Sequence, residues 1–119
     1  MRCVIVDDNE AFLEVARTLL EQEGLSVAGV ASTGTDALRQ ITSLHPDVVL
    51  IDVFLGEESG LELARRLAED GHGDGATLIL ISTRPDLRGL MAASPAAGFL
   101  PKAELSAGAI RRIVDGCTR

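Results

Sequence analysis

Acidic side chains, hydroxyls and a lysine each follow a short apolar run of this sequence. They are Asp7 and Asp8 after Cys3–Val6, Asp52 after Val48–Ile51, Ser82 and Thr83 after Leu78–Ile81, and Lys102 after Gly98–Leu100 and Pro101. If these runs are parallel strands, their carboxyl ends meet at one edge of a sheet and the polar side chains gather there. Three carboxylates in one place repel one another unless a hard divalent cation neutralises them. The pattern therefore predicts a magnesium site.

Such a site could carry out phosphoryl transfer. Beside a bound cation, one carboxylate can act as a nucleophile toward a phosphoryl group, and the product needs cationic and hydroxyl partners for its oxygens. Lys102 and Ser82 could supply both. Any single aspartate of this kind is more commonly a helix cap or a solvated strand end. The combination of all these groups favours the chemical interpretation.

The elements that would position these groups alternate along the chain. The apolar runs, with a fifth at Val27–Ala31, are too short for buried helices and lack polar alternation, which is typical of buried parallel strands. Five helices are predicted between and after these strands. The first covers Phe12–Leu20 and ends before Gly24, the second runs from a cap at Thr33 to His45-Pro46, and the third runs from a capping pattern at Ser59 and Glu62 to the turn Gly71–Gly75. The fourth covers Leu87–Ala93 and ends at Ser94-Pro95, and the fifth begins near Ser106. This alternation predicts an α/β fold with helices on both faces of a parallel sheet.

Length and composition restrict the possible classes of protein. A chain of 119 residues with 46% hydrophobic residues can bury one core, so we expect a single domain. A net charge of -7 with three Phe, no Tyr and no Trp argues against a nucleic-acid surface. No apolar run approaches the roughly 20 residues that span a bilayer, so we expect a cytoplasmic protein with no membrane contact. Cys3 and Cys117 are then expected to be reduced, buried and without a redox role.

Two other functions, a phosphohydrolase and a cofactor carrier, fit the sequence less well. A phosphohydrolase with an aspartyl nucleophile would need a second acidic residue two positions after Asp52, where the chain has Phe54. A flavodoxin-like cofactor carrier would need a glycine- and hydroxyl-rich loop after the first strand, and the segment Asp7–Asn9 would instead repel phosphate.

The motifs together closely resemble the receiver domain of two-component response regulators. They are Val6-Asp7-Asp8-Asn9, Ile51-Asp52, Ile81-Ser82-Thr83 and Gly98-Phe99-Leu100-Pro101-Lys102, and the resemblance extends over essentially the whole chain. It implies a flavodoxin-like, doubly wound five-stranded parallel sheet of strand order 2-1-3-4-5 with five helices. We expect residues 1–119 to form one receiver domain with no output domain, although a fragment of a longer regulator would look the same.

The resemblance also implies a role for each site residue. It implies that Asp52 is phosphorylated by a sensor histidine kinase or a histidine phosphotransfer protein. It implies that Mg2+ is held by Asp8, Asp52 and the backbone carbonyl of Phe54, with Asp7 acting through water. Lys102 would be the ion-pair partner of the phosphate, Ser82 the switch hydroxyl and Phe99 the aromatic switch. The switch would alter the surface of the fourth helix, fifth strand and fifth helix, which would contact a downstream protein that the sequence does not identify. No enzymatic activity beyond self-phosphorylation and dephosphorylation is implied.

Three departures from the family pattern carry expectations of their own. Gly56 stands where proline is usual, which predicts a looser loop after Asp52. Ala103 replaces the proline that usually follows the lysine in a cis peptide, so we expect a trans bond. The resemblance implies that the positions of Phe54 and Arg84 influence the access of water to the phosphoryl group, so we expect a long-lived phosphorylated state.

One alternative from a different class stays open. A module with a receiver fold could signal by dimerisation or scaffolding without phosphorylation. Such modules usually lack the aspartate or the lysine, and this sequence has both. The chain could be a monomer or a phosphorylation-dependent dimer.

Overall fold

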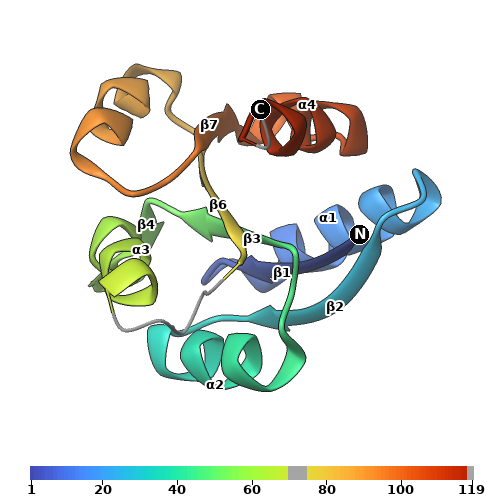
Figure 1. Cartoon of the computed structure of the whole chain (residues 1–119), viewed down its shortest axis with the longest axis horizontal. Coiled ribbons are helices and arrows are strands. Elements are labelled where there is room, and N and C mark those ends of the chain that lie inside the picture. The colour runs from blue at the N-terminus through green and yellow to red at the C-terminus, as the bar shows by residue number, and fades with distance from the viewer. Residues whose placement is uncertain (70–74, 118–119) are drawn as a thin grey trace.

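A parallel sheet with helices on both faces forms the centre of the molecule (Figure 1). The computed structural model describes residues 1–69 and 75–117. The strands of this five-stranded sheet are β1 (Arg2–Val6), β2 (Ser26–Ala31), β3 (Val48–Asp52), β6 (Thr77–Ser82) and β7 (Gly98–Pro101), in the order β2-β1-β3-β6-β7. Counted by sheet strands alone, this is the order 2-1-3-4-5, so the predicted flavodoxin-like fold is confirmed.

The helices divide the core into two layers. They are α1 (Glu10–Gln22), α2 (Gly34–Leu44), α3 (Gly60–Glu69), the 3-10 helix η1 (Pro85–Ala93) and α4 (Ala107–Cys117), and a three-residue 3-10 helix, η2 (Lys102–Glu104), follows β7. Side chains of a strand point alternately to the two faces, so Cys3 and Ile5 pack with α1 and α4, whereas Val4 and Val6 pack with α2, α3 and η1. Every sheet strand therefore contributes to both layers, and its polar carboxyl end lies beyond them.

Side-chain caps begin all four α-helices just after a strand or turn. Each cap oxygen accepts a hydrogen bond from a backbone N–H three residues later, which satisfies one free donor of the first helical turn. The pairs are Asn9 with Phe12 at 3.1 Å, Thr33 with Asp36 at 3.1 Å, Ser59 with Glu62 at 3.2 Å, and Ser106 with Ala109 at 3.0 Å. The predicted starts at Thr33, Ser59 and Ser106 are confirmed, and Gly24 follows the end of α1 with a φ of 94°.

The fourth helix differs in type from the prediction. The segment Pro85–Ala93 forms 3-10 turns, and none of its residues is buried. Pro85 at its start, Gly89 in its middle and only two partly buried apolar side chains, Leu87 and Met91, give little support to a regular amphipathic α-helix over tighter turns. It ends at Ser94, as the sequence indicates. The predicted turn at residues 71–75 falls outside the described residues, except for Gly75.

The loop after Asp52 is a hairpin, which the sequence did not predict. Strands β4 (Phe54–Leu55) and β5 (Glu58–Ser59) pair antiparallel, and Gly56 supplies the positive φ of 63° in the turn between them. The Glu58 carboxylate accepts from the Gly34 N–H at 3.1 and 3.3 Å, at the start of α2. Glycine here permits a paired turn, and the expectation of a looser loop stays a prediction.

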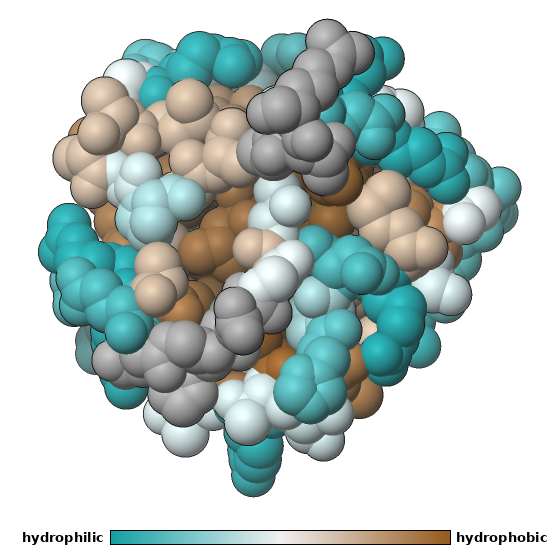
Figure 2. Space-filling model, viewed as in Figure 1, coloured by the Kyte–Doolittle hydropathy of each residue, from teal (hydrophilic) through white to brown (hydrophobic). Residues whose placement is uncertain are grey.

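The surface is polar around an apolar interior. In Figure 2, hydrophilic residues gather around the rim of the face and hydrophobic residues show near its middle. Among the described residues no helix is long and apolar enough to cross a membrane. Cys3 is a free, fully buried thiol, and burial raises its pKa to about 12. The side chain of Cys117 lies outside the described part of the chain.

Candidate functional site

Three aspartates converge at the carboxyl end of the sheet. One carboxylate oxygen from each of Asp7, Asp8 and Asp52 lies within 4.8 Å of the others. Asp7 and Asp8 follow β1, and Asp52 ends β3, which is hydrogen-bonded to β1. Asp7 is fully buried and Asp52 is 6% exposed, whereas Asp8 faces solvent. The predicted gathering of carboxylates at one sheet edge is thus present.

Lys102 reaches the buried pair of carboxylates from the end of β7. Its Nζ lies 2.5 Å from Asp7 Oδ2 and donates a hydrogen bond to Asp52 Oδ2 at 3.3 Å. Its side chain is only 12% exposed, so water screens these interactions weakly. No peptide bond of the described residues is cis, so the Lys102–Ala103 bond is trans, as expected. Lys102 is the only lysine in the sequence.

Close backbone contacts fix the position of Asp52. The Phe54 N–H donates to Asp52 Oδ1 at 3.2 Å, and the Gly60 N–H donates to the Val53 carbonyl at 2.9 Å. A Cβ on Gly60 would lie 1.8 Å from the carbonyl oxygen of Asp52. Only glycine therefore allows the start of α3 to approach the end of β3 so closely.

The environment of Asp52 favours its neutral form. Burial, and then the charge of Asp7, raise the pKa of Asp52 to about 6, while the Lys102 ammonium and the Phe54 N–H lower it in part. A carboxyl group in this situation is stabilised as an anion by an additional positive charge nearby. The site would thus gain from a bound cation.

The donor atoms fit a hard divalent cation. Three carboxylates face one ammonium group, which leaves an excess of negative charge. The buried Asp7 Oδ2 has this ammonium as its charge partner but accepts no well-aligned hydrogen bond from the described residues. Carboxylate oxygens are the ligands that Mg2+ prefers. The cluster is therefore a suitable magnesium site.

Ser82 and Phe99 lie on the two strands beyond β3. Ile81 pairs with Asp52, so Ser82 stands one residue further along the neighbouring strand, where its Oγ accepts from the Arg84 N–H at 3.1 Å. Ser82 is buried, and Phe99 is 3% exposed within the core layer of α2, α3 and η1. The Arg88 guanidinium carbon lies 5.3 Å from the centroid of the Phe99 ring.

Some contacts around the site were not predicted from the sequence. Asn9 caps α1 and also donates its N–H to Asp7 Oδ1 at 2.9 Å. Its position just before an apolar helical period is a recognisable capping signal. Nothing in the local sequence indicates the contact of Gly60 with Asp52. The Phe12 ring, with its centroid 4.4 Å from Lys102 Nζ, was predicted only as part of a helix.

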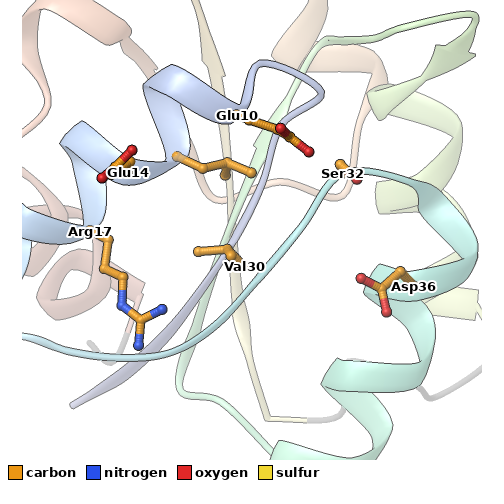
Figure 3. Close-up of a pocket in the computed structure, with 7 residues that line it drawn as sticks. Glu10, Glu14, Arg17, Val30, Ser32 and Asp36 are labelled. Atoms are coloured by element: carbon orange, nitrogen blue, oxygen red, sulfur yellow. The ribbon is translucent and has the colours of Figure 1, made fainter.

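A separate cavity lies between α1, β2 and α2 (Figure 3). Its volume is about 410 Å³, and its walls include the side chains of Glu10, Glu14, Arg17 and Asp36. None of the clustered aspartates, Ser82 or Lys102 lines it. Three carboxylates against one guanidinium do not suit an anionic ligand. This cavity is therefore not the site that the sequence predicts.

Fold and site together define a receiver domain. Residues 3–113 match the family described as the response regulator receiver domain, and the chain belongs to this family. It is 30% identical over 120 residues to the response regulator GacA of Pseudomonas aeruginosa, with 98% of this chain and 56% of GacA covered. It is 34% identical over 104 residues to the response regulator MprA of Mycobacterium tuberculosis, with 86% of this chain and 44% of MprA covered.

A solved structure supports the same assignment. A two-component response regulator of the LuxR family from Aurantimonas sp. SI85-9A1 superimposes with a TM-score of 0.80 and 27% identity, over 97% of this chain and 85% of that one. The chain spans about half the length of the two regulators above, at 56% and 44%.

Proposed function

We propose that Asp52 accepts a phosphoryl group, in the presence of Mg2+, from a sensor histidine kinase or a histidine phosphotransfer protein. The observation that supports this most strongly is the convergence of Asp7, Asp8 and Asp52 within 4.8 Å, with Lys102 hydrogen-bonded to Asp52. Membership of the receiver family supports the same role. In this proposal residues 1–119 act as one receiver domain, and their output is contact with another protein.

In this proposal Asp8, Asp52 and the Phe54 carbonyl hold Mg2+, and Asp7 acts through a water molecule. The ion would neutralise the carboxylates and withdraw charge from the phosphoryl oxygens. Asp7 is fixed for this role by the Asn9 N–H on Oδ1 and by Lys102 at Oδ2. Asp8 is exposed, so an ion could reach its carboxylate from solvent.

The transfer is a displacement at phosphorus. A carboxylate oxygen of Asp52 forms the new O–P bond while the P–N bond of a phosphohistidine breaks, and the imidazole nitrogen keeps the electron pair and takes up a proton. Lys102, already within 3.3 Å of Asp52, would then pair with a phosphoryl oxygen. Asp52 is thereby converted from a buried acid with a raised pKa into an acyl phosphate.

The phosphorylated site would act on the surface of η1, β7 and α4. The Ser82 hydroxyl would turn to donate to a phosphoryl oxygen, and Phe99 would occupy the space beside it. In this structure the Phe99 ring is already buried at 3% exposure, so phosphorylation would stabilise the inward ring. The downstream partner would bind this surface, with this chain either as a monomer or as a phosphorylation-dependent dimer.

We also propose a long-lived phosphorylated state and no other enzymatic activity. Phe54 stands where an acid–base carboxylate would be needed, and its side chain is 53% exposed beside Asp52. The Arg84 guanidinium pairs with Asp86 at 2.8 Å. Rapid loss of the phosphoryl group in magnesium buffer without a phosphatase would contradict this. The cytoplasmic location stays a prediction.

The test is the intact mass of the protein after incubation with acetyl phosphate or phosphoramidate, with and without Mg2+. We expect one added phosphoryl group on the wild type with Mg2+, and none on Asp52→Asn. Asp47→Asn, which changes an exposed aspartate outside the cluster, should be modified like the wild type. No uptake under any condition would instead favour a phosphorylation-independent dimerisation or scaffold module.

A further inference from the structure

The ammonium of Lys102 lies over the face of an aromatic ring. Its Nζ is 4.4 Å from the centroid of Phe12, on the first turn of α1. A ring face carries negative charge density, which attracts a cation at this distance. Because the Lys102 side chain is only 12% exposed, water weakens this attraction little.

The ring is itself fixed in place. Asn9 Oδ1 caps α1 by accepting from the Phe12 N–H at 3.1 Å, and the Asn9 N–H donates to Asp7 Oδ1 at 2.9 Å. The Phe12 side chain is partly buried and packs against the core layer of α1 and α4. Asp7 in turn contacts Lys102, whose Nζ lies 2.5 Å from Asp7 Oδ2, so the same contacts link the ring to the ammonium that it supports.

Lys102 has two carboxylates within reach, and only one of them is the proposed phosphoacceptor. Its ammonium is closer to Asp7, at 2.5 Å, than to Asp52, at 3.3 Å. A lysine side chain is a flexible stem with a compact charge, so ion pairing alone leaves several arrangements open to it. A ring that supports the ammonium from a third direction restricts it to the place where it meets both carboxylates.

We propose that Phe12 is a positioning residue for Lys102 in phosphoryl transfer. Its ring face holds the ammonium beside Asp52, so that Lys102 is in place when the phosphoryl group arrives. The proposal rests on the function proposed above for Asp52 and Lys102. It assigns a role to α1 beyond packing on the sheet.

Three variants distinguish the effect of the aromatic face from the effect of apolar packing. Phe12→Leu keeps an apolar side chain and removes the aromatic face, whereas Phe12→Tyr keeps the face. Leu19→Ala shortens another partly buried apolar side chain of α1 and serves as the control for lost packing. From the usual strength of cation–π contacts, Phe12→Leu should slow phosphorylation by acetyl phosphate by about 2- to 30-fold. Phe12→Tyr and Leu19→Ala should react at close to the wild-type rate.

A second measurement reports the contact directly. Because Lys102 is the only lysine, protein labelled with 13C-lysine gives one set of side-chain signals by nuclear magnetic resonance. Protons above a ring face are shifted upfield by its ring current. We expect this upfield shift of the ε-protons in the wild type, Phe12→Tyr and Leu19→Ala, and its loss in Phe12→Leu.

The outcomes distinguish the two proposals. Loss of the upfield shift together with slower phosphorylation in Phe12→Leu, both retained in Phe12→Tyr, supports the positioning role. An unmoved signal in Phe12→Leu, or a moved signal with an unchanged rate, overturns the role of Phe12 while the function of Asp52 stands. A wild type that takes up no phosphoryl group overturns the proposed function and, with it, this role.

Discussion

Without a metal and at neutral pH, Asp52→Asn is expected to stabilise the protein. The pKa of Asp52 is raised from 3.8 to about 6, first by burial and then by the charge of Asp7. At about 1.4 kcal/mol for each pKa unit, keeping Asp52 ionised in the folded state costs about 3 kcal/mol. This net shift already includes the opposing effect of the Lys102 ammonium, so a variant that removes the charge should gain up to about 3 kcal/mol in the free energy of unfolding.

The sign of the pH dependence follows from the direction of the shift. The folded protein binds the Asp52 proton more tightly than the unfolded chain, so this group stabilises the wild type fully below pH 3.8. That contribution is lost as the pH rises to about 6. The advantage of Asp52→Asn should therefore be largest above pH 6 and should shrink as the pH falls toward 4.

Urea unfolding followed by circular dichroism measures this, because the chain has no Trp or Tyr for fluorescence. Asp47→Asn is the control, since an asparagine there can still accept from the Arg2 N–H, which now lies 2.7 Å from Asp47 Oδ2. At pH 8, added Mg2+ should stabilise the wild type more than Asp52→Asn. The reasoning is refuted if Asp52→Asn is less stable than the wild type at pH 8 without metal, or if the difference is the same from pH 5 to pH 8.

Two further predictions test the packing around the site and the core. Gly60→Ala should destabilise the protein by about 2–4 kcal/mol in urea unfolding, because its Cβ would lie 1.8 Å from the Asp52 carbonyl oxygen. At Gly116 in α4, an added Cβ would meet no side chain or other element of the described residues within 4 Å, so Gly116→Ala should instead stabilise by about 0.5–1 kcal/mol; equal effects of the two would contradict this contrast. In a Cys117→Ser background, the buried Cys3 thiol, with its pKa raised to about 12, should react with a thiol reagent only after unfolding, and fast modification of the folded protein would show that it is accessible.

Much of the fold was predictable because its signals are local. Short apolar runs indicated the five sheet strands, and capping residues such as Thr33 and Ser59 marked the helix starts. The type of the fourth helix was not predictable, since no side chain of Pro85–Ala93 is fully buried and only Leu87 and Met91 pack in part on the core. The hairpin after Asp52 was missed because Gly56 permits both a loose loop and a tight turn.

The candidate site was also predictable in part. The sequence by itself determined which groups end each strand, and parallel pairing then requires Asp7, Asp8, Asp52 and Lys102 to meet at one edge. Only the tertiary structure decided how they meet. The ring of Phe12 beneath Lys102, and the fit of Gly60 against Asp52, depend on the distance between elements whose positions are set by packing of the whole core. Those distances leave no local pattern in the sequence, because each involves residues that are neighbours only after the chain has folded.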